Sequence, residues 1–140
     1  MQTIVIAADH AGFELKHKII LYLKDQQYNV LDLGCNNMDA VDYPDYAYSL
    51  CEKIGNEHST GILVCGSGVG MSMAANRFKH IRAALCSDAN IAQLSREHND
   101  ANVLVLGARI IDQETAFSCV NKFLNTEFKA GKHQIRVGKL

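Results

Sequence analysis

Short apolar segments alternate along the chain with segments whose apolar residues have helical spacing. The apolar segments are TIVIAA (3–8), NVLDLG (29–34), GILVC (61–65), RAALC (82–86) and NVLVLG (102–107). The helical pattern is clearest in residues 13–26, where Leu15, Ile19 and Leu23 share one face, and it recurs in residues 113–125. Strands that alternate with helices pair in parallel, because each helix returns the chain to the same end of the sheet. The alternation therefore predicts an α/β fold with a five-stranded parallel sheet.

We expect helices on both faces of this sheet, which makes a single-domain, Rossmann-like, three-layer α/β/α sandwich. A length of 140 residues suits one domain, here residues 1–140 with a basic C-terminal tail over 129–140. The remaining helices are expected to begin near Pro44, within the loop after Cys65, and near Asp88. The usual order for five such strands is 2-1-3-4-5, and ligands then bind beyond the carboxyl ends of strands 1 and 3.

Composition excludes several classes of function. The formal net charge of −1 argues against a protein that binds the nucleic-acid backbone. No apolar stretch reaches the roughly 18 residues of a membrane-spanning helix, and the first residues, MQTIVIAADH, do not have the layout of a signal peptide. The scattered cysteines include no CxxC pair, which predicts neither a zinc site nor a disulfide framework, and a reducing cytoplasm is expected. The cysteines are Cys35, Cys51, Cys65, Cys86 and Cys119.

A glycine-rich loop, CGSGVG at 65–70, follows the third predicted strand. It lacks the dinucleotide fingerprint, because position 71 is Met71 and the loop does not follow the first strand, and it has no P-loop lysine. What remains is a row of backbone amides leading into a helix, which suits a phosphate or a developing oxyanion. Alternatively, the glycines only form a tight turn and let the helix and strand pack closely. The loop residues are Gly66, Ser67, Gly68, Val69 and Gly70.

Cys65 stands at the start of this loop, near the positive end of the helix that follows. Such a position favours a thiolate, so Cys65 is a candidate base or nucleophile. The alternative is a buried, inert cysteine, which is what we expect of Cys51, Cys86 and Cys119.

Polar residues also follow the first two predicted strands. Asp9 and His10 come directly after the first strand, and Tyr43 comes after the second. All three are expected near the glycine loop, because the carboxyl ends of parallel strands share one edge. Alternatively, Asp9 caps the following helix and Tyr43 is a surface aromatic residue over a helix start.

His98 and Asn99 precede the fifth predicted strand and therefore belong to the opposite edge of the sheet. A strand of ordinary length places roughly 17–20 Å between the two edges. His98 is thus expected to serve the site of a partner subunit, in a two-fold dimer that makes this exchange twice. The alternative is a pair that ends a helix, with His98 favourable to the helix dipole and Asn99 in a left-handed turn.

Basic residues gather late in the chain: Arg109 after the fifth strand, then Lys132, His133 and Arg136. In a protein of near-neutral charge they are a candidate phosphate clamp, because arginine binds phosphate with two parallel hydrogen bonds. The alternative is a solvated tail.

Taken together, these motifs resemble the type B ribose-5-phosphate isomerases, a family shared with galactose-6-phosphate isomerase subunits. The resemblance covers essentially the whole chain through ADHAGFELK, DYPDYA, CGSGVGMSMAANRFKHIRAAL, SREHNDANVLVLGAR and GKHQIRV. It implies an aldose–ketose isomerase of the pentose phosphate pathway that acts on a sugar phosphate without metal or organic cofactor. It also implies a homodimer, in some members paired into a tetramer, with active sites shared between subunits and no nucleic-acid or membrane partner.

The resemblance assigns a role to each candidate residue. Cys65 resembles the base that moves a proton between C1 and C2, and His98 resembles the acid that opens the furanose ring. Gly66 to Gly70, Val69 included, resemble the loop that holds the enediolate oxygen, with Ser67 also facing the substrate. The positions similar to sugar contacts are Asp9, His10, Tyr43 and Asn99. The positions similar to the phosphate clamp are Arg109, Lys132 and Arg136, with His133 beside them.

Two positions depart from the family pattern. Ser67 stands where many members have Thr, which keeps the hydroxyl, and Lys132 stands where Arg is common, which replaces a planar fork by a point charge. Ribose 5-phosphate is the expected substrate, with ribulose 5-phosphate as product. The alternatives are a six-carbon phosphate of allose or galactose, a non-catalytic nucleotide-binding module, and a redox sensor that uses Cys65.

Overall fold

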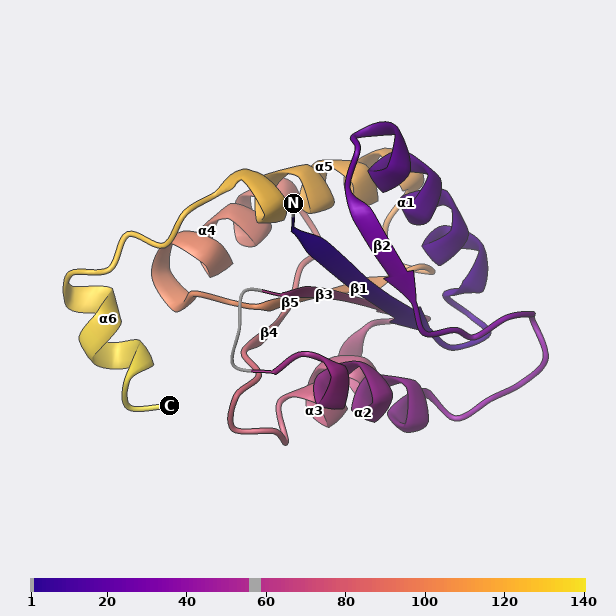
Figure 1. Ribbon diagram of the computed structural model, residues 1–140, viewed down its shortest axis with the longest axis horizontal. Helices are drawn as coiled ribbons and strands as arrows, with labels where there is room; N and C mark the ends of the chain where they lie inside the picture. The colour runs from indigo at the N-terminus through magenta and orange to yellow at the C-terminus, as the bar shows by residue number, and fades with distance from the viewer. Residues whose placement is uncertain (1, 56–58) are drawn as a thin grey trace.

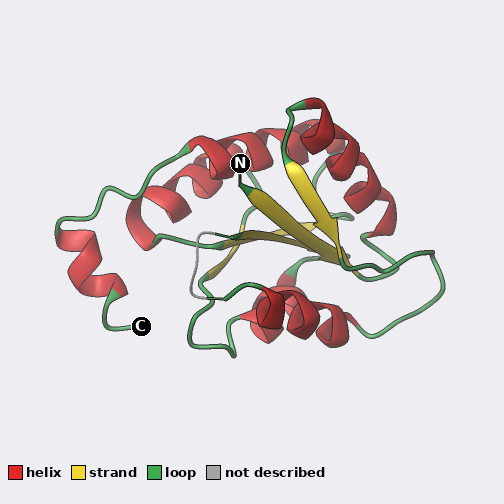
Figure 2. Cartoon of the chain, viewed as in Figure 1, coloured by secondary structure: helices red, strands yellow, loops and turns green. Residues whose placement is uncertain are grey.

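A five-stranded parallel sheet forms the centre of the protein (Figure 2), as the alternating sequence predicted. The computed structural model describes residues 2–55 and 59–140. Every paired strand runs parallel to its neighbour. The strands are β1 (Thr3–Ala8), β2 (Asn29–Asp32), β3 (Thr60–Cys65), β4 (Ala83–Leu85) and β5 (Val103–Gly107).

The strand order is β2-β1-β3-β5-β4, so the predicted order 2-1-3-4-5 is wrong for its last two strands. Burial explains the exchange. All five residues of β5 are buried, as suits an inner strand, whereas β4 has three residues and none is fully buried. The short, partly exposed strand therefore takes the edge, where only one neighbour is needed.

Helices cover both faces of the sheet, which confirms the three-layer arrangement (Figure 1). One layer holds α1 (Phe13–Asp25), α4 (Ala89–Asn99) and α5 (Gln113–Asn125), and the other holds α2 (Tyr43–Lys53) and α3 (Val69–Ala75). Successive residues of a strand point to opposite faces. Ile4 and Ile6 of β1 accordingly pack in the first core, while Val5 and Ala7 pack in the second.

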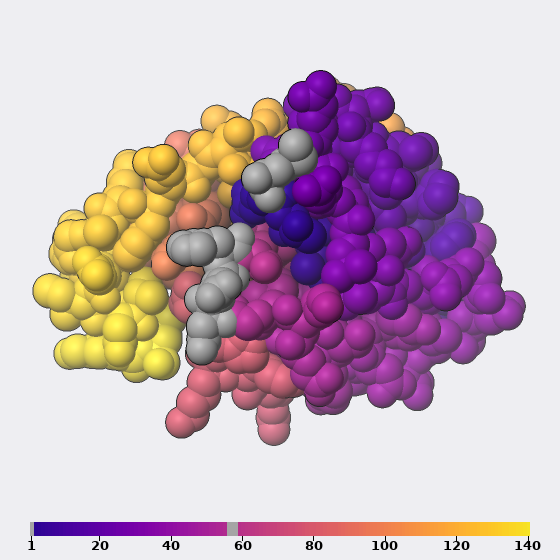
Figure 3. Space-filling model, in the orientation of Figure 1, coloured from indigo at the N-terminus to yellow at the C-terminus, as the bar shows by residue number. Residues whose placement is uncertain are grey.

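The basic C-terminal segment is not an extended tail. It forms a six-residue helix, α6 (Lys132–Val137), in which no residue is buried. In Figure 1 this helix lies beside the end of α4, beyond the amino ends of the strands, and Figure 3 shows it as a lobe at one end of the molecule. Its position places the C-terminal cations at the edge of the sheet opposite to the glycine loop.

None of the helices in the described parts of the chain is both long and apolar enough to span a bilayer. The longest, α1 and α5, have 13 residues each, and a spanning helix needs about 20.

Candidate active site

Two central strands bring Asp9 and Cys65 to the same edge of the sheet. Asp9 follows β1, Cys65 ends β3, and these strands are neighbours. The backbone N–H of Asp9 donates to the carbonyl of Val64 over 3.2 Å, which joins the two strand ends directly. The start of α1 is equally close, because a Cβ atom at Gly12 would lie 2.4 Å from the Val64 carbonyl oxygen. Only a glycine allows this approach.

The glycine loop folds back onto the sulfur of Cys65. Gly68 has φ +82°, a left-handed conformation that favours glycine, and its N–H donates to Cys65 Sγ over 3.2 Å. Val69 N–H donates to Ser67 Oγ, also over 3.2 Å, at the point where α3 begins. The loop is therefore a tight turn in which one amide, that of Gly68, is directed at the thiol. Cys65 is 5% exposed, while the Ser67 beside it is exposed.

The other four cysteines are buried like Cys65, as predicted for the three that we expected to be inert. Burial raises the pKa of Cys51 and Cys86 to about 12 and that of Cys119 to about 11. It also raises the pKa of Cys35. Where these thiols form hydrogen bonds, they donate to backbone carbonyls. Among the hydrogen bonds of the described residues, Cys65 is the one cysteine whose sulfur accepts a backbone N–H.

Asp9 and His10 are held by the backbone around them. Asp9 is 7% exposed, and its Oδ1 accepts the N–H of Gly12 over 3.1 Å, so it stabilises the turn before α1 rather than capping the helix itself. His10 Nδ1 accepts the N–H of Val41 over 3.1 Å. An acceptor at Nδ1 leaves the proton of the neutral ring on Nε2, which is then available as a donor.

Tyr43 and Arg109 complete this group. A Cβ atom at Gly70 would lie 2.6 Å from the Tyr43 ring, and one at Gly66 would lie 3.3 Å from Arg109 Nη1. The phenol and the guanidinium therefore flank the loop from two sides. We call these residues the glycine-loop cluster: Asp9, His10, Tyr43, Cys65 to Gly70 and Arg109.

A second group forms where α4 ends. The rings of His98 and His133 stack with their centroids 4.2 Å apart and 13° between their planes, which joins α4 to α6. Burial and the neighbouring His98 lower the pKa of His133, with further contributions from Lys132, Arg136 and Lys129. We call these residues the α4–α6 cluster: His98, Asn99, Lys132, His133 and Arg136.

The end of α4 differs from the expected cap. Asp100, and not Asn99, has the left-handed conformation, with φ +48°. Its carboxylate pairs with Arg96 at 2.9 Å and with Arg82 at 3.4 Å, which holds the turn in place.

The two clusters lie at opposite edges of the sheet in one chain. The strand β5 runs from the end of α4 toward Arg109, and its length is about 13 Å. Sequence reasoning expected this separation for His98. The prediction of one basic set is not matched within the chain, because Arg109 is in the glycine-loop cluster and Lys132, His133 and Arg136 are in the other.

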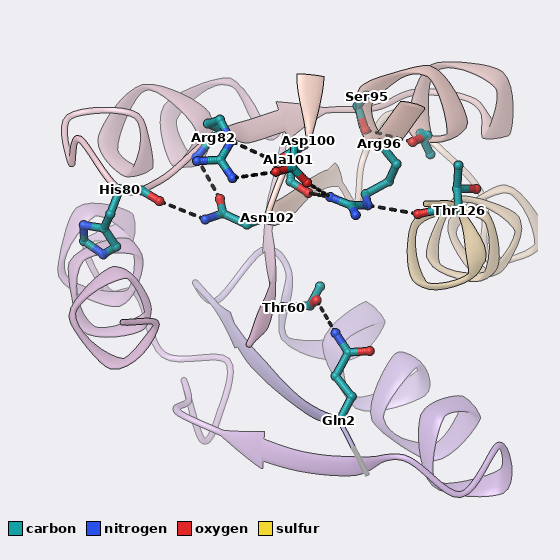
Figure 4. A network of polar contacts seen from close by, with 11 residues as sticks. Gln2, Thr60, His80, Arg82, Ser95, Arg96, Asp100, Ala101, Asn102 and Thr126 are labelled. Atoms are coloured by element: carbon teal, nitrogen blue, oxygen red, sulfur yellow. Dashed lines mark hydrogen bonds and ion pairs between the residues drawn. The ribbon is translucent and has the colours of Figure 1, made fainter. Parts of the chain in front are cut away.

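A cavity of about 970 Å³ lies at neither cluster. It is at the amino ends of the strands, over a network of polar side chains that includes Arg82, Arg96, Asp100 and Asn102 (Figure 4). The two arginines share Asp100, and Asn102 bonds the backbone of His80 and Arg82. These groups satisfy one another, so the network is best explained as support for the strand starts. No group of three or more potential metal ligands occurs among the described residues.

The fold defines a parallel α/β protein whose candidate site residues Asp9 and Cys65 lie at the carboxyl ends of its central strands. The model of the Ribose/Galactose Isomerase family matches residues 4–140, so the chain belongs to this family.

Solved and curated relatives agree with this assignment. Ribose-5-phosphate isomerase B of Escherichia coli is 44% identical over 138 residues, which cover 98% of this chain and 93% of the relative. The crystal structure of a ribose 5-phosphate isomerase from Thermotoga maritima has a TM-score of 0.96 at 50% identity, covering 99% of this chain and 96% of that one. Ribose-5-phosphate isomerase B from Mycoplasma genitalium, solved with bound ribulose 5-phosphate, has a TM-score of 0.95 at 44% identity, covering 98% and 92%.

Proposed function

We propose that this chain interconverts ribose 5-phosphate and ribulose 5-phosphate through an enediolate, with Cys65 as the base. The observation that carries the proposal is the hydrogen bond from Gly68 N–H to Cys65 Sγ, at the edge of the sheet where β1 and β3 end and where Asp9 also lies. A thiolate held there removes the C2 proton of the open-chain aldose and returns a proton to C1. The negative charge that develops on the sugar oxygen is met by the loop amides of Gly66 to Gly70 and by the Ser67 hydroxyl.

The remaining steps need groups at both ends of the substrate. His98 of the partner subunit donates the proton that opens the furanose ring. Arg109, together with Lys132 and Arg136 of the partner subunit, binds the phosphate and so supplies binding energy remote from the reacting carbons. Asp9, His10, Tyr43 and the partner subunit's Asn99 contact the sugar hydroxyls, and the partner subunit's His133 lies beside the clamp. No step requires a metal or an organic cofactor.

Two observations support a homodimer with shared sites. The two clusters are too far apart to act on one pentose phosphate within a chain. Exposed apolar side chains also occur on adjacent elements α3, β4 and α4 at the open edge of the sheet, which suits an interface with a second copy. These side chains are Val69, Met73, Leu85, Ile91 and Leu94. Five free cysteines in turn support a reducing, cytoplasmic location.

The proposal is tested by assaying formation of ribulose 5-phosphate from ribose 5-phosphate with and without a chelator. We expect turnover, unchanged by the chelator. Allose 6-phosphate and galactose 6-phosphate, assayed in parallel, should give a lower kcat/KM. A higher kcat/KM on either would assign a six-carbon substrate, and stabilisation by nucleotides without turnover of any sugar phosphate would support the nucleotide-binding alternative.

Shared sites predict recovery of activity when two inactive variants are mixed. In a hybrid of Cys65→Ala and His98→Ala chains, one site combines both lesions and the other has an intact Cys65 and an intact His98. Random exchange makes half of the dimers hybrid, so about a quarter of the wild-type sites should return. The measurement is turnover after mixing, with subunit exchange confirmed by native mass spectrometry. Confirmed exchange without recovery would contradict the sharing of sites.

A further inference from the structure

An ion pair between a buried lysine and an exposed aspartate lies near the glycine-loop cluster without a role in the proposed reaction. Lys16 of α1 is 1% exposed and is the largest fully buried side chain of the described residues. Its Nζ is 2.8 and 2.9 Å from the two carboxylate oxygens of Asp32, the last residue of β2. The Asp32 side chain is 37% exposed, and an ion pair with an exposed partner adds little net stability, so stability alone is a weak reason for burying Lys16.

The Asp32 carboxylate also holds the chain that follows it. Asp32 Oδ1 accepts the N–H of Gly34 over 2.9 Å. From there the chain continues alongside the end of β1: the Gly34 carbonyl accepts the N–H of Ala8 over 2.7 Å, and Cys35 N–H donates to the Ala8 carbonyl over 2.9 Å. The pair thus fixes the connection at the residue that precedes Asp9.

The connection over residues 33–42 then reaches the glycine-loop cluster again at its far end. Val41 N–H donates to His10 Nδ1, and the next helix begins at Tyr43, whose ring lies over Gly70. Between these two attachments lies an exposed stretch, residues 36–40. The position of this connection therefore depends on how firmly its first residues are held.

We propose that the Lys16–Asp32 pair is a positioning device: it fixes the connection 33–42 against the end of β1 and thereby orients His10 and Tyr43. Lys16 and Asp32 are positioning residues, because they act through this connection. The structural effect stands on the geometry alone, and only its effect on turnover rests on the proposed function.

The test is Lys16→Met, which keeps the length of the buried stem and removes the charge. We expect the amide exchange of Gly34 and Val41 to accelerate at least about tenfold. The acceptors of these amides, Asp32 Oδ1 and His10 Nδ1, stay in the chain but are held less firmly without the lysine charge. At about pH 9, where histidine is neutral, the nitrogen shifts of His10 should move from a single tautomer toward a mixture. Turnover of ribose 5-phosphate should fall about 10- to 100-fold in kcat/KM, as expected for a misplaced contact group.

The matched control is Val120→Ala in α5, a buried position in the layer formed with α4. It should lower the melting temperature while leaving the Val41 exchange, the His10 tautomer and kcat/KM close to wild type. If Lys16→Met does not fold, Asp32→Asn replaces it: the amide oxygen still accepts from Gly34, but the charge attraction is lost, and the same changes are expected at smaller size.

Unchanged Val41 exchange and an unchanged His10 tautomer in the folded variant would overturn the positioning role. The same changes in Val120→Ala would overturn it too, because they would then report general destabilisation. Absence of turnover in the wild-type protein, with the two spectroscopic changes present in Lys16→Met, would count against the proposed function and in favour of the positioning role.

Discussion

Replacing Cys65 by alanine should lower the turnover of ribose 5-phosphate by about 10² to 10⁴-fold, the usual effect of removing a general base. Binding of the sugar phosphate should change little, since we propose that the phosphate contacts come from Arg109 and from α6 of the partner subunit. The Gly68 N–H loses its acceptor in this variant. The turn should nevertheless persist, because glycine readily adopts the left-handed conformation that the turn needs at position 68. The measurements are kcat by ribulose formation and the thermal shift produced by ribose 5-phosphate.

Cys119→Ala is the matched control for this variant. Cys119, on α5, is fully buried, and burial raises its pKa to about 11. The control should cost stability and leave turnover unchanged. If Cys65→Ala lost turnover and binding equally, Cys65 would be a structural residue of the loop.

Replacing His98 by alanine should separate ring opening from proton transfer. Ribose 5-phosphate is largely cyclic, whereas ribulose 5-phosphate has its 5-hydroxyl esterified and remains open-chain. Conversion of ribose 5-phosphate should fall by about 10² to 10⁴-fold without the acid. Exchange of the C1 hydrogen of ribulose 5-phosphate with D₂O needs no ring opening and should stay close to wild type.

Proton NMR measures this exchange directly, and His17→Ala, an exposed position on α1, is the control. Loss of exchange equal to the loss of conversion would remove the ring-opening role and would point to His98 in the proton transfer itself. Wild-type behaviour in both assays would show that His98 has no part in the reaction.

Local patterns in the sequence predicted most of the fold. β1 and α5 have the predicted bounds, because apolar spacing and flanking caps act within one element. The order of β4 and β5 was missed, since it depends on which strand obtains two neighbours, and this is decided by burial across the whole sheet. The helix α6 was missed for a related reason: with no buried residue, it leaves no apolar stripe to recognise.

The sequence predicted the part of the candidate site that lies at the ends of strands. It did not predict the part that depends on contacts between separate elements. The parallel topology alone brings Asp9 and Cys65 together. The contact of Tyr43 with Gly70, the stacking of His98 on His133 and the Lys16–Asp32 pair join residues from separate elements. Lys16, the lysine in ADHAGFELK, could have been noticed as a charge on the apolar side of a helix. Nothing in the sequence identified Asp32 as its partner.

The distance between the two clusters has a consequence for how such an enzyme works in dilute solution. With sites shared between subunits as we propose, a folded, solitary chain would hold every required side chain and still not complete a turnover. Specific activity would therefore follow the fraction of chains that are paired. At protein concentrations below the dissociation constant of the dimer, activity would fall without any unfolding. Substitutions far from the substrate that weaken association would then be recorded as catalytic defects.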